Sequence, residues 1–154
     1  MQAQLPPSLI IYNLFPRLVG TIDKWYPHVL RANEMGFNAI YFNPVNQTGF
    51  SGSLYSIKNF FEFNRYFHPQ ELGDWSEFIE LVKKIHQLTP CKPNPNVMGP
   101  LTKIIKEEYC EPKNMLVIVD LVINHSAIDC DLIKEHPNWF KQDNDGKIRN
   151  PFAI

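Results

Sequence analysis

The longest apolar stretch of the chain runs from Met115 to Ile123, is interrupted only by Asp120, and is followed by Asn124 and His125. Apolar and polar residues do not alternate in it, which predicts a strand buried on both faces, as in a parallel sheet covered by helices. Ligands of parallel α/β folds bind at the carboxyl ends of the strands. Asp120, Asn124 and His125 are therefore candidate site residues.

The N-terminal third predicts a strand, a helix and a second strand. Residues 8–12 and 38–43 are short apolar runs, and between them apolar residues recur at helical spacing over residues 21–35. Thr21 is placed to cap the start of this helix and Gly36 its end. The order predicts a right-handed βαβ unit with two parallel strands.

Three further segments complete the pattern. Residues 46–67, rich in glycine, serine and aromatic residues, predict a long functional loop without secondary structure. Residues 74–88 predict an amphipathic helix that returns the chain to the sheet. Residues 89–114, with several prolines, predict an insertion before the apolar strand, and residues 128–135 predict a short helix after it.

Composition places one compact soluble domain over residues 1–154, with 44% hydrophobic residues, 20% charged residues and a net charge of -1. Scattered basic residues argue against a nucleic-acid partner, and the apolar stretches are too short to span a membrane. The first residues have no signal-peptide pattern, which favours a cytoplasmic location. Three parallel strands with two crossover helices leave a sheet face uncovered, and a (β/α)8 barrel needs about 250 residues. We therefore expect an incomplete barrel, or a sheet edge that pairs with something else.

Four segments, in this order along the chain, resemble the α-amylase family of glycoside hydrolases and transglycosidases. Residues 12–17 resemble the first barrel strand with its loop, and residues 36–45 the second-strand signature. Residues 120–125 resemble the D-x-x-x-N-H signature of the third strand, and residues 136–140 the segment that follows it. The resemblance implies an α/β fold made of the first three β/α units of a TIM (β/α)8 barrel, and an α-glucan or maltooligosaccharide as the ligand.

Carried over by position, the resemblance implies a role for four residues. His125 would donate a hydrogen bond to the sugar next to the scissile linkage, and Tyr55 would stack on the same sugar. Asp120 would hold neighbouring strand-end residues, and Asn124 would be the position that binds a structural calcium ion in many members. The structural alternatives are a hydrogen-bonded core histidine and a packed tyrosine. The family commonly has aspartate where Ser56 and Asn59 stand here.

Retaining glycoside cleavage needs two carboxylates about 5 Å apart. The family places them after the fourth and fifth strands, and no acidic residue here matches those motifs, so we assign no catalytic residue to the chain. The leading hypothesis is part of an α-glucan hydrolase or transglycosidase that lacks the catalytic carboxylates and pairs with the rest of its barrel. The alternative is a non-catalytic sugar-binding or regulatory remnant. A nucleotide-binding module is disfavoured because no glycine-rich phosphate loop follows a strand.

Overall fold

The computed structural model of the chain describes residues 9–68, 74–89 and 114–149. Residues 90–113, which make up nearly all of the predicted insertion, lie outside this part, so the insertion stays a prediction. None of the helices in the described ranges is long and apolar enough to cross a membrane.

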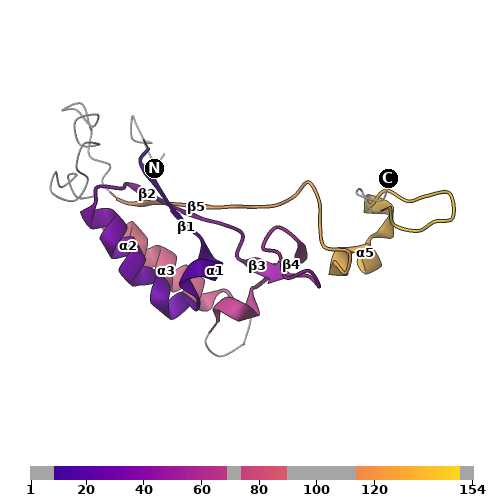
Figure 1. The fold of residues 1–154 in the computed structure, drawn as a ribbon, viewed down its shortest axis with the longest axis horizontal. Helices are drawn as coiled ribbons and strands as arrows, with labels where there is room; N and C mark the ends of the chain where they lie inside the picture. Colours follow the sequence, from indigo (N-terminus) through magenta and orange to yellow (C-terminus); the bar gives the residue numbers. More distant parts are fainter. Residues whose placement is uncertain (1–8, 69–73, 90–113, 150–154) are drawn as a thin grey trace.

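A three-stranded parallel sheet is the centre of the fold (Figure 1). Its strands are β1 (Ile11–Leu14), β2 (Ala39–Phe42) and β5 (Leu116–Val119), in the order β1-β2-β5. Both pairings are parallel: Leu14 lies beside Phe42, and Phe42 beside Val119. The predicted parallel arrangement is confirmed, and the carboxyl ends of all three strands lie at one edge of the sheet.

Two helices cover one face of this sheet (Figure 1). The first is α2 (Trp25–Glu34), entered through the short helices α1 (Pro16–Val19) and η1 (Ile22–Lys24). Gly36 follows the helix and its C-cap Met35, and its φ of 91° is a conformation that glycine adopts without strain. The second is α3 (Ser76–His86), which agrees with the helix predicted over residues 74–88.

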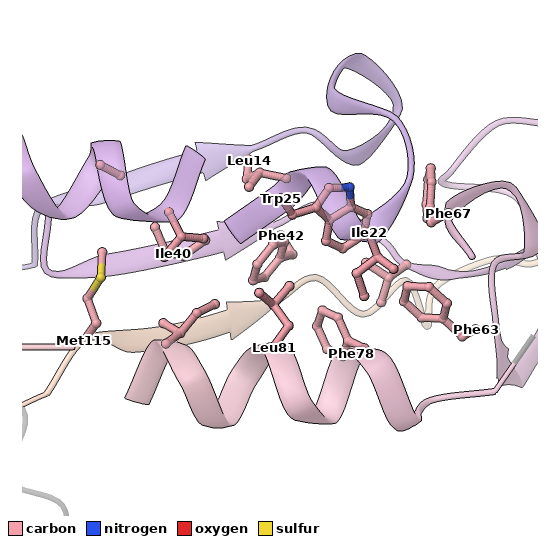
Figure 2. Close-up of a cluster of buried hydrophobic side chains, with 14 of the residues drawn as sticks. Leu14, Ile22, Trp25, Ile40, Phe42, Phe63, Phe67, Phe78, Leu81 and Met115 are labelled. Carbon is pink, nitrogen blue, oxygen red and sulfur yellow. The ribbon is translucent and has the colours of Figure 1, made fainter. Parts of the chain in front are cut away.

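Aromatic rings fill the layer between the helices and the sheet (Figure 2). Trp25 of α2 is fully buried and stacks on Phe42 of β2, with ring centroids 5.5 Å apart. Phe78 of α3 meets the edge of Phe42 at 5.5 Å and stacks on Phe63 at 5.7 Å. Burial of several large rings in one layer is the main source of stability of this fold, because buried apolar area is the dominant favourable term in folding.

Residues 46–67 form an antiparallel hairpin rather than the loop without secondary structure that the sequence predicts, so that prediction is wrong. Its strands are β3 (Asn46–Thr48) and β4 (Ile57–Phe63), followed by the short helix η2 (Arg65–Phe67). The hairpin lies beyond the carboxyl ends of the parallel strands (Figure 1). Two register shifts interrupt the pairing of β3 with β4. They remove the regular alternation of apolar and polar residues that indicates a strand in a sequence.

Strand β5 is shorter and more exposed than predicted, and the expectation of burial on both faces is wrong. It lies at an edge of the sheet in the described residues, so its outer side is open, and Val119 is 40% exposed. Residues 120–149, here called the C-terminal arm, lead away from the sheet (Figure 1). The arm contains α5 (Asp131–Glu135) and η4 (Pro137–Trp139), neither of which has a buried residue, and neither packs on the sheet in the described part of the chain.

Candidate functional site

Three polar side chains share the face of the sheet that α2 and α3 leave uncovered. Side chains alternate between the two faces of a strand, and Ile40 and Phe42 belong to the core beneath the helices. Tyr41 and Asn43 therefore point to the opposite face. Asp120 follows β5 with the same parity, because its amide donates to the Phe42 carbonyl at 2.9 Å and continues the parallel pairing. The candidate site begins with these three residues at the carboxyl edge of the sheet.

Tyr41 and Asp120 form a hydrogen-bonded pair across β2 and β5. The hydrogen bond between the two side chains, burial, and the negative charge of Asp120 together raise the pKa of Tyr41 from 10.0 to about 12. The tyrosine therefore stays a neutral donor at physiological pH, and the carboxylate has a partner. The contact joins Asp120 to a residue at the end of a neighbouring strand, and its supporting role in a sugar site stays a prediction.

Tyr55 is anchored to the end of β2. The amide Nδ2 of Asn43 donates to the Tyr55 hydroxyl at 2.7 Å. Tyr55 lies in the turn of the hairpin and is 41% exposed, whereas Asn43 is only 5% exposed. The phenol group is thus held at its hydroxyl end while the ring is open to solvent.

The C-terminal arm lies against the same hairpin. The Ala127 amide donates to the Ile57 carbonyl at 2.8 Å, and the Phe50 amide donates to Oδ1 of Asp129 at 3.0 Å. Gly49 permits this approach, because a Cβ at position 49 would lie 2.3 Å from the Ala127 Cβ. The hairpin turn and the arm therefore hold each other in place.

A further hydrogen bond joins the middle of the hairpin to α5. Nδ2 of Asn59 donates to Oδ2 of Asp131 at 3.1 Å, and Oδ1 of Asn59 accepts from the Phe61 amide at 2.8 Å. The amide thus connects hairpin and arm from a position where the family commonly has aspartate.

His125 lies on the exposed part of the arm, next to the hairpin rather than in the core. It is two residues from Ala127, and Tyr55 is two residues from Ile57, so the Ala127–Ile57 hydrogen bond brings the two segments together. Nδ1 of His125 lies 3.0 Å from Oδ1 of Asn124. The tautomer decides which of the two ring nitrogens carries the hydrogen, and Nε2 is the nitrogen that this contact leaves for a ligand hydroxyl.

The described residues do not fit a calcium site around Asn124. Calcium takes six to eight oxygen ligands, several of them carboxylates. Oδ1 of Asn124 is engaged with His125, and no group of three or more His, Cys, Asp or Glu residues that could hold a metal ion occurs in the described ranges.

Tyr41 and Asn43 are missing from the sequence-based site. The sequence does contain a signal for them. Both lie at the carboxyl end of a predicted strand, just before Pro44, and a polar residue at a strand end is also the pattern that identifies Asp120 as a candidate. The pairing of Tyr41 with Asp120 and of Asn43 with Tyr55 depends on strand register and on the path of the hairpin, which the sequence pattern does not give.

A parallel sheet with helices on one face and polar groups at its carboxyl edge is the arrangement of one part of a TIM-barrel enzyme, and comparisons with known proteins agree. A family model described as "Glycogen debranching enzyme, glucanotransferase domain" matches residues 4–143. The chain belongs to this family, and with it to the α-amylase type of barrel that its motifs resemble.

Individual relatives are more distant. An alpha-1,4-glucan:maltose-1-phosphate maltosyltransferase from Picrophilus torridus is 24% identical over 90% of this chain and 20% of its own length. An alpha-amylase from Lactobacillus plantarum has a TM-score of 0.63 and 23% identity over 94% of this chain and 29% of the amylase. A noncanonic maltogenic alpha-amylase from Thermotoga neapolitana has a TM-score of 0.62 and 26% identity over 90% of this chain and 29% of the amylase. The chain thus spans less than a third of each of these proteins, and its fold is that of part of a TIM-barrel amylase.

Proposed function

We propose that this chain supplies the sugar-binding edge of an α-glucan-active enzyme of the α-amylase type, acting as a glycoside hydrolase or transglycosidase. The observation that carries the proposal is the family match over residues 4–143, which includes every residue of the candidate site. Of the three similar proteins named above, one is an alpha-1,4-glucan:maltose-1-phosphate maltosyltransferase and two are alpha-amylases.

The chemistry of the candidate site suits a neutral hexose. A sugar ring has a weakly polar face that packs on an aromatic plate, and hydroxyl groups that need acceptors and donors. Tyr55 is 41% exposed and offers the plate, while the exposed His125 offers a ring nitrogen that, with its hydrogen, donates to a sugar hydroxyl as the family resemblance implies. The two residues are brought to adjoining segments by the hairpin contact, which supports their joint role as substrate-binding residues.

We further propose that the chain holds the first three β/α units of a barrel and that the remaining units pack on the open side of β5. An apolar groove between β5 and α3 supports this arrangement. Its lining consists of residues from these two elements and the N-cap of α3: Trp75, Phe78, Ile79, Val82, Lys83, His86, Val117 and Val119. In a complete barrel, a neighbouring strand and helix would cover a groove of this kind.

The catalytic carboxylates are proposed to come from the rest of that barrel. Retaining cleavage needs a nucleophile and an acid/base group about 5 Å apart. Asp120 is engaged with the Tyr41 hydroxyl, which suits a supporting role rather than that of a nucleophile. The 154-residue chain is accordingly expected to bind an α-glucan without cleaving it.

Isothermal calorimetry with maltoheptaose tests the binding site. Tyr55→Ala and His125→Ala are each expected to raise the dissociation constant about tenfold, since one loses the stacking surface and the other a hydrogen bond. Tyr66→Ala is the matched control, because Tyr66 is 70% exposed on η2 and outside the site. Equal affinities of wild type, Tyr55→Ala and His125→Ala would overturn the proposal.

An assay of reducing ends tests whether this chain binds the glucan while the rest of the barrel supplies the catalytic carboxylates. Release of reducing sugar from maltoheptaose by the chain alone would show that its own carboxylates are catalytic and would contradict the proposal. The same assay on the natural polypeptide that contains the chain, with a labelled acceptor glucan present, separates hydrolysis from transfer. Binding without turnover in that polypeptide would favour the sugar-binding remnant.

A further inference from the structure

We infer that Asn43 is a positioning residue: its buried amide fixes the orientation of the Tyr55 ring so that one face is presented to the sugar. This inference rests on the proposed function, because it gives Tyr55 the role of the stacking plate. The observation behind it is the 2.7 Å hydrogen bond from Nδ2 of Asn43 to the Tyr55 hydroxyl.

The two ends of this hydrogen bond lie in very different surroundings. Asn43 directly follows β2 and precedes Pro44, whose ring fixes its own φ, and both residues are buried. Tyr55 lies in the turn between β3 and β4, where the Gly49 amide bonds the Ser56 carbonyl at 2.8 Å. The bond therefore ties an exposed turn residue to a rigid part of the sheet.

Holding the hydroxyl determines the direction of the whole side chain. A tyrosine has two side-chain torsions, and its hydroxyl is the atom farthest from the backbone. Once that atom is fixed at Asn43, both torsions are restricted and the plane of the ring is set. A ring ordered in advance loses less conformational freedom when a sugar stacks on it, which strengthens binding.

The side-chain oxygen of Asn43 shows that packing alone does not explain why an asparagine occupies this position. Its Oδ1 is buried and has no hydrogen-bond partner among the described residues. Exchanging the oxygen and nitrogen of the amide would keep the bond to the phenol and still leave one amide atom unpaired. A leucine of the same shape would avoid this cost, since burying an unpaired polar atom is unfavourable. The benefit of an amide at this position thus lies in its contact with Tyr55.

A double-mutant cycle in the 154-residue chain tests the inference, with maltoheptaose as the probe. Asn43→Leu and Tyr55→Phe each remove the hydrogen bond and keep the shape of the side chain. Each is expected to raise the dissociation constant about fivefold, and the double variant no more than either single one. The midpoint of urea unfolding of Asn43→Leu is expected to be unchanged or raised, so the loss of affinity is not a loss of folding.

Asn46→Ala is the matched control. Asn46 is also 5% exposed, and its Nδ2 donates to the Phe60 carbonyl at 2.8 Å, within the hairpin. This variant is expected to unfold at lower urea concentration while keeping the affinity of the wild type. Three results would overturn the inference: unchanged affinity in Asn43→Leu while Tyr55→Ala loses binding, equal losses of affinity in Asn43→Leu and Asn46→Ala, or multiplied losses in the double variant.

Ring dynamics test the same point without any sugar. Carbon-13 relaxation of the Tyr55 ring in the free chain is expected to show faster reorientation in Asn43→Leu than in the wild type or Asn46→Ala. Unchanged reorientation would overturn the inference. If the wild type binds no maltoheptaose, the proposed function fails, and the ring measurement still decides whether Asn43 holds Tyr55.

Discussion

The chain has two regions of opposite character: a packed body, which comprises residues 9–89 and 114–119 as far as they are described, and the C-terminal arm, residues 120–149. Two tryptophans show the contrast. Trp25 of the body is fully buried among aromatic rings, whereas Trp139 of the arm is 66% exposed and stacks on His136, with ring centroids 4.0 Å apart. The body is held by its own core, and the arm is held mainly by its contacts with the hairpin.

The candidate site lies where the two regions meet. Tyr41, Asn43 and Tyr55 belong to the body, and Asp120 and His125 belong to the arm. The proposed sugar binding would therefore depend on the placement of a weakly packed segment against a strongly packed one. The comparison separates two kinds of variant: those that unfold the body and those that displace the arm.

The largest expected effect is on the stability of the body. Trp25→Ala removes the ring that stacks on Phe42 and is expected to lower the free energy of unfolding by about 3 to 5 kcal/mol. Trp139→Ala, the same change in the arm, is expected to alter it by less than about 0.5 kcal/mol. Urea unfolding followed by circular dichroism measures both values. Similar losses in the two variants would break the distinction between body and arm.

The next effect is on the contact between the two regions. Gly49→Ala places a Cβ 2.3 Å from the Ala127 Cβ and 2.4 Å from Oδ1 of Asp129, so the arm must shift away from the hairpin. We expect a loss of about 1 to 3 kcal/mol of stability and faster hydrogen exchange at the Ala127 amide.

The exchanged pair Gly49→Ala with Ala127→Gly removes the closest of these contacts and keeps the composition. It is expected to recover most of the protection of the amide at position 127. If the Ala127 amide of the Gly49→Ala variant kept the hydrogen-exchange protection of the wild type, the arm would not pack against Gly49.

The smallest effect concerns the Tyr41–Asp120 pair at high pH. The pKa of Tyr41 is about 12 in the folded chain and 10.0 in the unfolded one, so the folded state keeps its proton longer. The resulting stability is fully present below pH 10 and is lost as the pH rises toward 12. Tyr41→Phe is expected to remove this part of the pH dependence, and Asp120→Asn to reduce it. Urea unfolding between pH 8 and 12 measures it, and a Tyr41→Phe profile parallel to that of the wild type would contradict the shift.

Much of the body follows from sequence periodicity. The predicted strands over residues 8–12, 38–43 and 115–123 contain or adjoin β1, β2 and β5, and the predicted helices contain α2 and α3. In these segments most of the apolar residues that mark the period pack in the core, whereas Leu30 and Ile79 are exposed. Phe78, Leu81 and Ile85 of α3, for example, are all buried. Local pattern and tertiary packing agree there, which is why the pattern is informative.

Prediction failed where tertiary arrangement decides the outcome. The sequence of β5 is apolar throughout, yet the strand lies at an edge of the described sheet, and edge position is a property of strand order. The hairpin was missed because two register shifts disturb the alternation of β3 and β4. In the site, motif matching identified single residues such as Tyr55 and Asp120. The side chains that hold them, Asn43 and Tyr41, became visible only through strand pairing.

The order β1-β2-β5 also has a consequence for the behaviour of the chain at high concentration. Each outer strand of the described sheet carries a row of backbone amides and carbonyls on the side without a neighbour, and on β5 this row lies next to the exposed Val119. Such rows are templates for pairing with strands of other copies, and proteins generally avoid this by covering the edge or adding charges. A strand that covered the β5 edge would remove this template and so lower the tendency of the chain to pair with other copies at high concentration.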